Sequence, residues 1–193
     1  MHSSLEKLSL VKNKVNQIVN EKQLKIDPKI IVVTKTFPLS KIMPLLENGH
    51  IHYAENKIQE AENKWIDIKK RYKNLQLHMV GQLQTNKAKK AVKLFIQVNL
   101  AEESRKSGIM FNELNNFYNY CTKDLSLNVI GLMCMPPVDS NFQKCFEKLQ
   151  KAAGQLNLED LSMGMSSDYE QAILSGSTYL RLGTVIMGER NSR

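Results

Sequence analysis

The chain has 193 residues, 42% of them hydrophobic, and a formal net charge of +8. This is enough apolar content for one large core, so we expect residues 1–193 to form a single domain. No apolar run approaches the length that spans a bilayer, and the N-terminal residues lack the apolar centre of a signal peptide, so we expect a cytoplasmic protein without membrane contact. Three cysteines without a CxxC spacing disfavour both a disulfide framework and a zinc knuckle.

Much of the positive charge lies in two clusters of basic residues, at 64–73 and 87–93. Such clusters can bind phosphate backbones, but they are more often solvated helix faces, and no aromatic-rich nucleic-acid motif accompanies them. We therefore disfavour nucleic acid as a partner. A positive field would also attract a small phosphorylated ligand.

Apolar spacing along the chain changes repeatedly between the periods of a helix and of a strand. Strands are expected at 30–34, 51–54, 76–80, 94–99, 129–133, 161–163 and 179–182. Helices are expected at 5–22, 39–48, 58–73, in a basic segment after Gly81, near 114–121, at 141–155, and after a capping-box pattern at 167–170. This alternation predicts a parallel α/β sheet that is either doubly wound or closed into a (β/α) barrel.

The residues at or just beyond the predicted strand ends favour the barrel, because barrel enzymes gather their chemistry at that rim. They are Lys35, Glu55, Asn56, Gly81, Asn99, Met133, Gly164 and Arg181. No GxGxxG motif follows the first strand, which weakens a dinucleotide-binding fold. His50 and His52 would share one face of a strand, as metal ligands do, but no third ligand is evident nearby, so we predict no metal site.

Lys35 ends a buried, β-branched strand. There it would be poorly hydrated, which makes its neutral amine available as a nucleophile toward carbonyls; an ordinary strand end that turns into solvent is the alternative. Two late loops could bind an anion, one containing Ser166 and the other Gly183 and Thr184, although a helix cap and a tight turn would also explain them. Together these features suggest a phosphate-bearing aldehyde held as a Schiff base, with pyridoxal phosphate as the obvious candidate.

Segments in the same order resemble the pyridoxal phosphate homeostasis protein family, which is related to the N-terminal domain of alanine racemase. They are VTKT at 33–36, AENKIQE at 54–60, HMVGQLQTNK at 78–87, QVN at 97–99 with KSG at 106–108, GLM at 131–133, LSMGMS at 161–166, and RLGT at 181–184 with GER at 188–190. The resemblance runs nearly from end to end. It implies a TIM-type (β/α) barrel of the fold-type III pyridoxal phosphate proteins.

The resemblance also implies a role for each matched residue. Lys35 would carry the cofactor, Ser166, Gly183 and Thr184 would hold its phosphate, and Asn56 and Arg181 would lie beside its ring. If Arg181 faces the pyridine nitrogen, its permanent charge keeps that nitrogen unprotonated and the ring is a weak electron sink. The implied function is binding, buffering or delivery of pyridoxal 5'-phosphate inside the cell, without established turnover, with apo forms of cofactor-dependent enzymes as further partners.

Two departures from the family pattern concern the fold. Ala54 stands where the family usually has glycine, and its methyl group should be tolerated unless the backbone needs a positive φ. Between Phe95 and Ile96 the family normally has one further strand and helix, so we count seven strands where eight are usual. Either a βα unit is lost, which leaves two strand edges unpaired, or the sequence omits it. Because the unit holds no assigned cofactor residue, we expect binding to survive where stability does not.

An amino-acid racemase that uses the same Schiff base is the alternative function. Racemases that resemble this barrel need a second, β-rich domain whose tyrosine is one of two acid–base groups, and only three residues follow Arg190. Unless Tyr53 or Tyr179 supplies that group, the racemase is disfavoured. Without the domain that pairs racemase subunits, we also expect a monomer. A barrel that binds nucleic acid or another phosphate ester, with Lys35 as a plain charge, is a third possibility.

Overall fold

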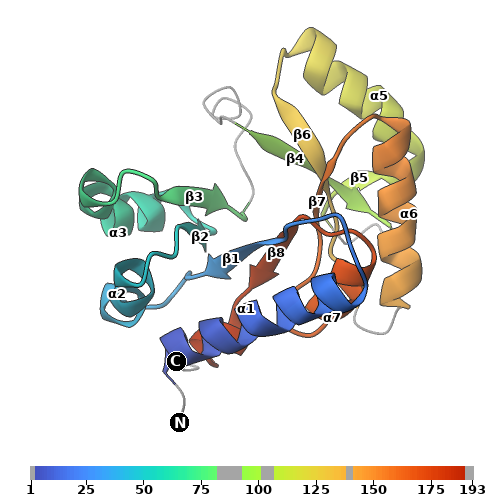
Figure 1. Cartoon of the computed structure of the whole chain (residues 1–193). Helices are drawn as coiled ribbons and strands as arrows, with labels where there is room; N and C mark the ends of the chain where they lie inside the picture. Colours follow the sequence, from blue (N-terminus) through green and yellow to red (C-terminus); the bar gives the residue numbers. More distant parts are fainter. Residues whose placement is uncertain (1–2, 82–92, 101–106, 138–140, 190–193) are drawn as a thin grey trace.

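The computed structural model describes residues 3–81, 93–100, 107–137 and 141–189. Within these residues, eight strands form one sheet in the order β3-β2-β1-β8-β7-β6-β4-β5, and every neighbouring pair is parallel (Figure 1). The strands are β1 (Lys29–Val33), β2 (His52–Glu55), β3 (Gln76–Met79), β4 (Leu94–Asn99), β5 (Ile109–Met110), β6 (Val129–Met133), β7 (Asp160–Ser162) and β8 (Tyr179–Leu182). The α-helices are α1 (Ser4–Glu21), α2 (Leu39–Glu47), α3 (Ile58–Arg71), α5 (Leu114–Asn119), α6 (Phe142–Gln155), α7 (Tyr169–Leu174) and α8 (Thr184–Met187).

All seven predicted strands are present, and the predicted helices lie within a few residues of their expected positions wherever the structure describes them. The two-residue strand β5 and the four-residue helix α8 were not predicted. The capping-box prediction for α7 was wrong, because that helix begins one residue later, after Asp168, whose side chain makes no cap hydrogen bond. The capping box lies instead at the start of α1, where Ser3 and Glu6 bond each other's backbone N–H groups. The basic segment after Gly81 lies outside the described residues.

Ring contacts across the sheet show that it curls into a barrel wall. The rings of Phe95 on β4 and Tyr179 on β8 are 5.2 Å apart, and those of His78 on β3 and Tyr179 are 6.1 Å apart. Each of these strands lies three positions from β8 in the sheet, which would be about 14 Å in a flat sheet. Tyr179 therefore contacts side chains from both ends of a strongly curved sheet.

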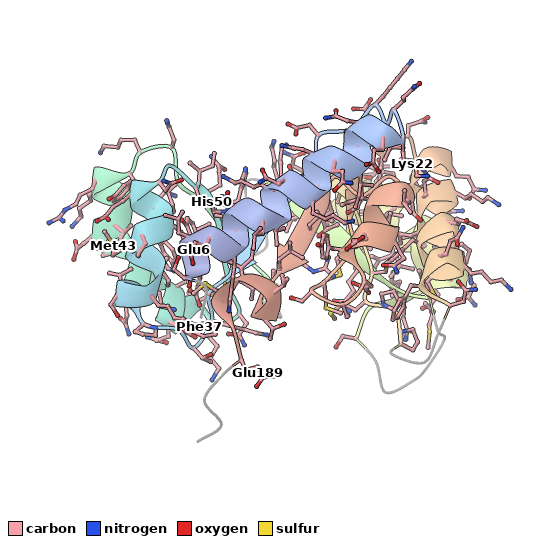
Figure 2. All side chains as sticks on the ribbon, turned by 60° about the horizontal axis from the view of Figure 1, so that its bottom comes forward. Glu6, Lys22, Phe37, Met43, His50 and Glu189 are labelled. Carbon is pink, nitrogen blue, oxygen red and sulfur yellow. The ribbon has the colours of Figure 1, made fainter. Side chains whose placement is uncertain are left out.

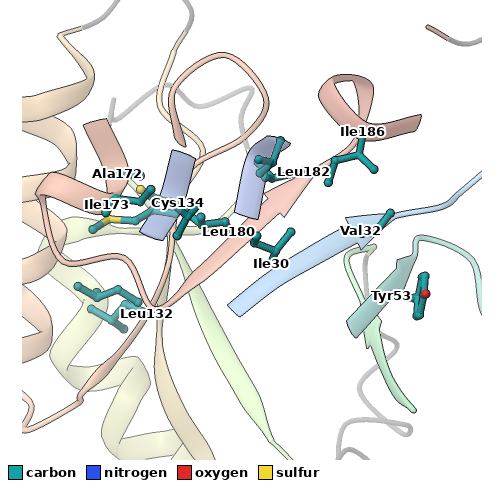
Figure 3. Packing of buried hydrophobic residues seen from close by; sticks show 14 of the residues in the cluster. Ile30, Val32, Tyr53, Leu132, Cys134, Ala172, Ile173, Leu180, Leu182 and Ile186 are labelled. Carbon is teal, nitrogen blue, oxygen red and sulfur yellow. The ribbon is translucent and has the colours of Figure 1, made fainter. Parts of the chain in front are cut away.

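The two faces of the curved sheet bury different sets of residues. The concave inner face carries a small cluster of Ile31, Ala54 and Tyr179, with Phe95 packed against it. The convex face packs against the helices and holds the main core, in which Figure 3 shows Ile30, Val32, Leu180 and Leu182 of the two central strands. Helix α1 crosses this outer layer and contacts α2, α7 and α8 (Figure 2). None of the described helices is both long and apolar enough to cross a bilayer.

The sheet is open between β3 and β4. In the described part of the chain β3 pairs only with β2, and β4 pairs with β6 and with the short β5. The predicted place of the missing strand and helix, between Phe95 and Ile96, lies inside the continuous strand β4, which borders this opening. Strand β5 covers only Val98 and Asn99 of the β4 edge. Ala54, the other departure from the family pattern, is fully buried without a positive φ, so its methyl group is tolerated as expected.

Three histidines gather at the amino ends of β2 and β3. Nδ1 of His52 lies 3.1 Å from Nε2 of His78, and Nε2 of His50 contacts the carbonyl of His52 at 3.0 Å. Burial, assisted by nearby lysine charge, lowers the pKa of His50 and of His78 to about 4 and also lowers the pKa of His52. The three rings are therefore packed as neutral groups. Among the described residues no cluster of three potential ligands could hold a metal ion.

These buried rings predict a loss of stability in acid. Each pKa of about 4 lies below the unfolded value of 6.5, so the unfolded chain binds protons first as the pH falls. The free energy of unfolding should therefore fall between pH 6.5 and pH 4, by up to about 3 kcal/mol for each ring. Urea unfolding at several pH values measures this. His78→Gln should flatten the profile, and an unchanged slope in that variant would contradict the assignment.

Replacing glycine by alanine should have opposite effects on stability at two positions, Gly131 and Gly154. A Cβ on Gly131 of β6 would lie 2.0 Å from the carbonyl oxygen of Asp160 and 2.7 Å from the Phe95 ring, whereas a Cβ on Gly154 of α6 would meet nothing within 4 Å. Gly131→Ala should therefore lower the free energy of unfolding by about 1–3 kcal/mol. Gly154→Ala, the matched control, should raise it by up to about 1 kcal/mol because alanine favours the helix. Denaturant melts that rank the two variants the other way would refute this packing.

Candidate functional site

The carboxyl ends of β1, β2 and β8 meet at one rim of the sheet. Val33 pairs with Ala54, and Val32 pairs with Leu182, so the residues that follow these pairs come together. Lys35 and Asn56 each lie two residues beyond a paired position, and Gly183 directly follows Leu182. A Cβ on Gly183 would lie 3.8 Å from that of Val33. The register therefore places Lys35, Asn56 and Gly183 at the same rim, and the Lys35 and Asn56 side chains are half-buried there.

Asn56 is held close to the end of the next strand. A Cβ on Gly81 would lie 2.0 Å from the carbonyl oxygen of Asn56, so only glycine lets the chain after β3 approach it. Asn56 also follows Glu55, whose side chain is fully buried. These contacts fix the position of Asn56 on the rim.

Two loops converge on the hydroxyl of Ser166. Its Oγ accepts hydrogen bonds from the backbone N–H groups of Gly183 and Val185, each at 3.3 Å. Thr184 lies between those two residues at the start of α8, with its side chain exposed. The two N–H groups thus point at the Ser166 oxygen itself, whose own hydroxyl hydrogen can be donated to another acceptor. This uncharged donor fits a phosphate oxygen, which accepts such a hydrogen bond well.

Asp168 holds the shape of the Ser166 loop. Its Oδ1 accepts a hydrogen bond of 2.5 Å from the backbone N–H of Met165, and its own N–H donates to the carbonyl of Met165. Burial raises the pKa of Asp168. The Asp168 carboxyl group therefore hydrogen-bonds within the loop that precedes α7 and stabilises the conformation of that loop.

Arg181 lies fully inside the barrel wall on β8. Its Nη1 donates to the carbonyl and the hydroxyl of Ser162, at 2.7 and 2.9 Å, and its Nη2 donates to the carbonyl of Cys134 at 2.9 Å. Burial lowers the pKa of Arg181, but a guanidinium group keeps its charge at physiological pH. The structure therefore holds a permanent cation two residues before Gly183, on neutral oxygen partners from β7 and from the residue after β6.

The strand register brings Lys35, Asn56 and Gly183 to one rim, and a hydrogen bond joins Gly183 to Ser166. Thr184 adjoins this group, whereas Arg181 pairs with Ile31 within the sheet and is bonded to Ser162 and Cys134. Val185 could not be identified from the sequence, because it contributes a backbone N–H group, which is present whatever the side chain. Sequence reasoning also missed Ser162 as a partner of Arg181. An alternation rule could have found that contact, since both residues lie on inward-facing positions of adjacent strands.

Comparison with known proteins identifies the family of this chain. The family model for the alanine racemase N-terminal domain matches residues 10–191. A pyridoxal phosphate homeostasis protein of Haemophilus influenzae is 29% identical, with 95% of this chain and 94% of the relative covered. Another, from Aquifex aeolicus, is 31% identical, with coverage of 84% and 87%.

Two solved structures share the fold. An unknown protein from Bifidobacterium adolescentis superposes with a TM-score of 0.82 at 21% identity, covering 95% of this chain and 94% of that one. PipY of Synechococcus elongatus, in a structure with pyridoxal phosphate bound, superposes with a TM-score of 0.70 at 27% identity, covering 90% of this chain and 100% of PipY.

The sequence alignments are also longer than the part of this chain that they contain. The alignment with the Haemophilus influenzae protein spans 224 positions, whereas 95% of 193 residues is about 183. The relative thus has roughly 40 residues without a counterpart here, which is enough for one strand and one helix. With the family model matched over nearly its whole length, the chain belongs to the pyridoxal phosphate homeostasis proteins of the alanine racemase N-terminal domain family.

Proposed function

We propose that this protein binds pyridoxal 5'-phosphate at the rim formed by β1, β2 and β8, and buffers or delivers it without turning over a substrate. The observation that carries the proposal is the placement of Lys35 beside the donors that converge on Ser166. The bound cofactor in the related PipY supports it. We further propose that the whole chain acts as one monomeric domain and that apo forms of cofactor-dependent enzymes receive the cofactor.

Each rim residue has a role in this proposal. The Lys35 amine would hold the cofactor through its aldehyde group. The hydroxyl of Ser166, the N–H groups of Gly183 and Val185 and the hydroxyl of Thr184 bind the phosphate. Asn56 and Arg181 flank the ring. Because Arg181 can only donate hydrogen bonds, it keeps the pyridine nitrogen unprotonated, which disfavours carbanion chemistry.

The positions of two tyrosines argue against the racemase. Tyr179 is paired with Lys29 at the amino end of β1, and its hydroxyl accepts a hydrogen bond from the Lys29 amine at 3.1 Å. Six residues separate Lys29 from Lys35, which is about 20 Å along an extended strand. Tyr53 belongs to the outer core and its ring lies 4.9 Å from that of Trp65. Neither tyrosine lies at the rim, where a second base would be needed.

Covalent trapping tests the assignment of Lys35. Incubation with pyridoxal phosphate followed by borohydride should leave one stable adduct, which peptide mass spectrometry maps to Lys35. Lys35→Ala should abolish it, because the strand register sets this lysine at the rim beside Gly183. Lys57→Ala, which removes an exposed amine next to Asn56, is the matched control and should leave the adduct intact. An adduct that persists in Lys35→Ala would move the site to another lysine.

Incubation with amino acids separates the carrier from the racemase. The loaded protein should convert neither D- nor L-alanine into its mirror image, and it should not exchange the alanine α-hydrogen with deuterated water above a cofactor-only control. The physical reason is that neither Tyr53 nor Tyr179 lies at the rim to act as a second base. Chiral chromatography and NMR measure both quantities. Racemisation that is lost in Lys35→Ala would replace the carrier with the enzyme.

A further inference from the structure

A buried group of charges lies directly behind Lys35, on the outer side of β1 and β2. Glu55 is fully buried, and its Oε1 accepts three hydrogen bonds: from the Thr34 hydroxyl at 2.7 Å, the Lys64 amine at 2.9 Å and the Trp65 indole N–H at 3.0 Å. Lys64 and Trp65 come from α3. Through this one oxygen, α3 is tied to the residue before Lys35.

The residue after Lys35 is tied to the same helix. The backbone N–H of Thr36 donates to Oε1 of Glu60 at 2.7 Å. The Lys64 amine donates to that same oxygen at 3.0 Å and to the carbonyl of Thr34 at 3.1 Å. The Lys64 amine therefore joins the two residues that flank Lys35, reaching Thr34 directly and Thr36 through Glu60.

The Thr36 backbone needs such support. Its φ of +71° lies in the left-handed region, which a β-branched residue rarely adopts, and such a conformation persists only where its surroundings enforce it. The hydrogen bond from Thr36 to Glu60 supports it from α3, and a backbone bond from the Phe37 N–H to the Thr34 carbonyl, at 3.1 Å, closes the same turn. Burial opposes ionisation of Glu60, but the hydrogen bonds from Thr36 and Lys64 outweigh it and lower the pKa of this carboxyl group. Glu60 therefore accepts the Thr36 hydrogen bond as a carboxylate.

We infer that Glu55, Glu60 and Lys64 form a clamp that holds the Lys35 turn in the conformation that presents its amine to the cofactor. Glu60 and Lys64 are positioning residues in this inference, since they act on Lys35 through its neighbours. The inference rests on the proposed function for Lys35. It adds that α3, on the outer side of the sheet, orients the amine through hydrogen bonds to the residues on either side of Lys35.

Glu60→Ala tests the clamp, with Glu62→Ala as the matched control because Glu62 is exposed on the same helix. Loss of the charged acceptor should weaken pyridoxal phosphate binding about tenfold, read from the dissociation constant and from borohydride trapping at Lys35. Glu60→Gln keeps a neutral acceptor and should weaken binding only about threefold. Glu62→Ala should bind as the unmodified protein does. Thermal unfolding of each variant checks that the fold persists.

A second readout needs no cofactor. In Glu60→Ala the amide hydrogen of Thr36 should exchange with deuterated water at least about tenfold faster, because it has lost its acceptor. Unchanged exchange, or faster exchange with unchanged cofactor binding, would overturn the clamp. If Glu60→Ala does not fold, the same two measurements on Glu60→Gln decide. Failure of the unmodified protein to form an adduct at Lys35 would instead refute the proposed function, and the Thr36 exchange would still report on the clamp.

Discussion

β1 and β8 are hydrogen-bonded neighbours although about 150 residues separate them along the chain, with Lys29 opposite Tyr179 and Val32 opposite Leu182. Every element of the candidate site depends on this pairing. It brings the strand that ends at Lys35 beside the strand that leads to Gly183, and the Gly183 N–H group then reaches the Ser166 loop after β7. In the proposed site, the early part of the sequence thus supplies the amine, and the late part supplies the phosphate donors.

The two ends and the two faces of the barrel wall carry different groups of residues. The carboxyl ends of the strands carry the polar rim, whereas the amino ends hold aromatic and neutral histidine rings that pack around Tyr179. Because Tyr179 contacts rings on both β3 and β4, the sheet stays curled although these two strands are not paired. The outer face adds the buried Glu55 group, which reaches the rim through the backbone of β1 rather than through the interior.

Elements with a long periodic pattern of apolar residues could be predicted from the sequence. Very short elements and features that depend on the backbone could not. The β-branched run of β1 and the regular apolar stripe of α1 have strong periodicity, so their bounds were close to those observed. β5 and α8 are too short to show any period. The meeting of Lys35, Asn56 and Gly183 could be predicted because parallel strands end at a common rim, but the N–H donor of Val185 and the left-handed turn at Thr36 have no sequence signature.

The long separation of β1 from β8 also sets an order of events during synthesis. A ribosome adds about 5–20 residues per second, so Gly183 is made roughly 7 to 30 seconds after Lys35. Until then β1 can pair with β2, but its other neighbour, β8, and the loop that holds Gly183 have not been made. The growing polypeptide therefore cannot bind its aldehyde ligand at full affinity on the ribosome. Full affinity requires that β8 leaves the exit tunnel and pairs with β1.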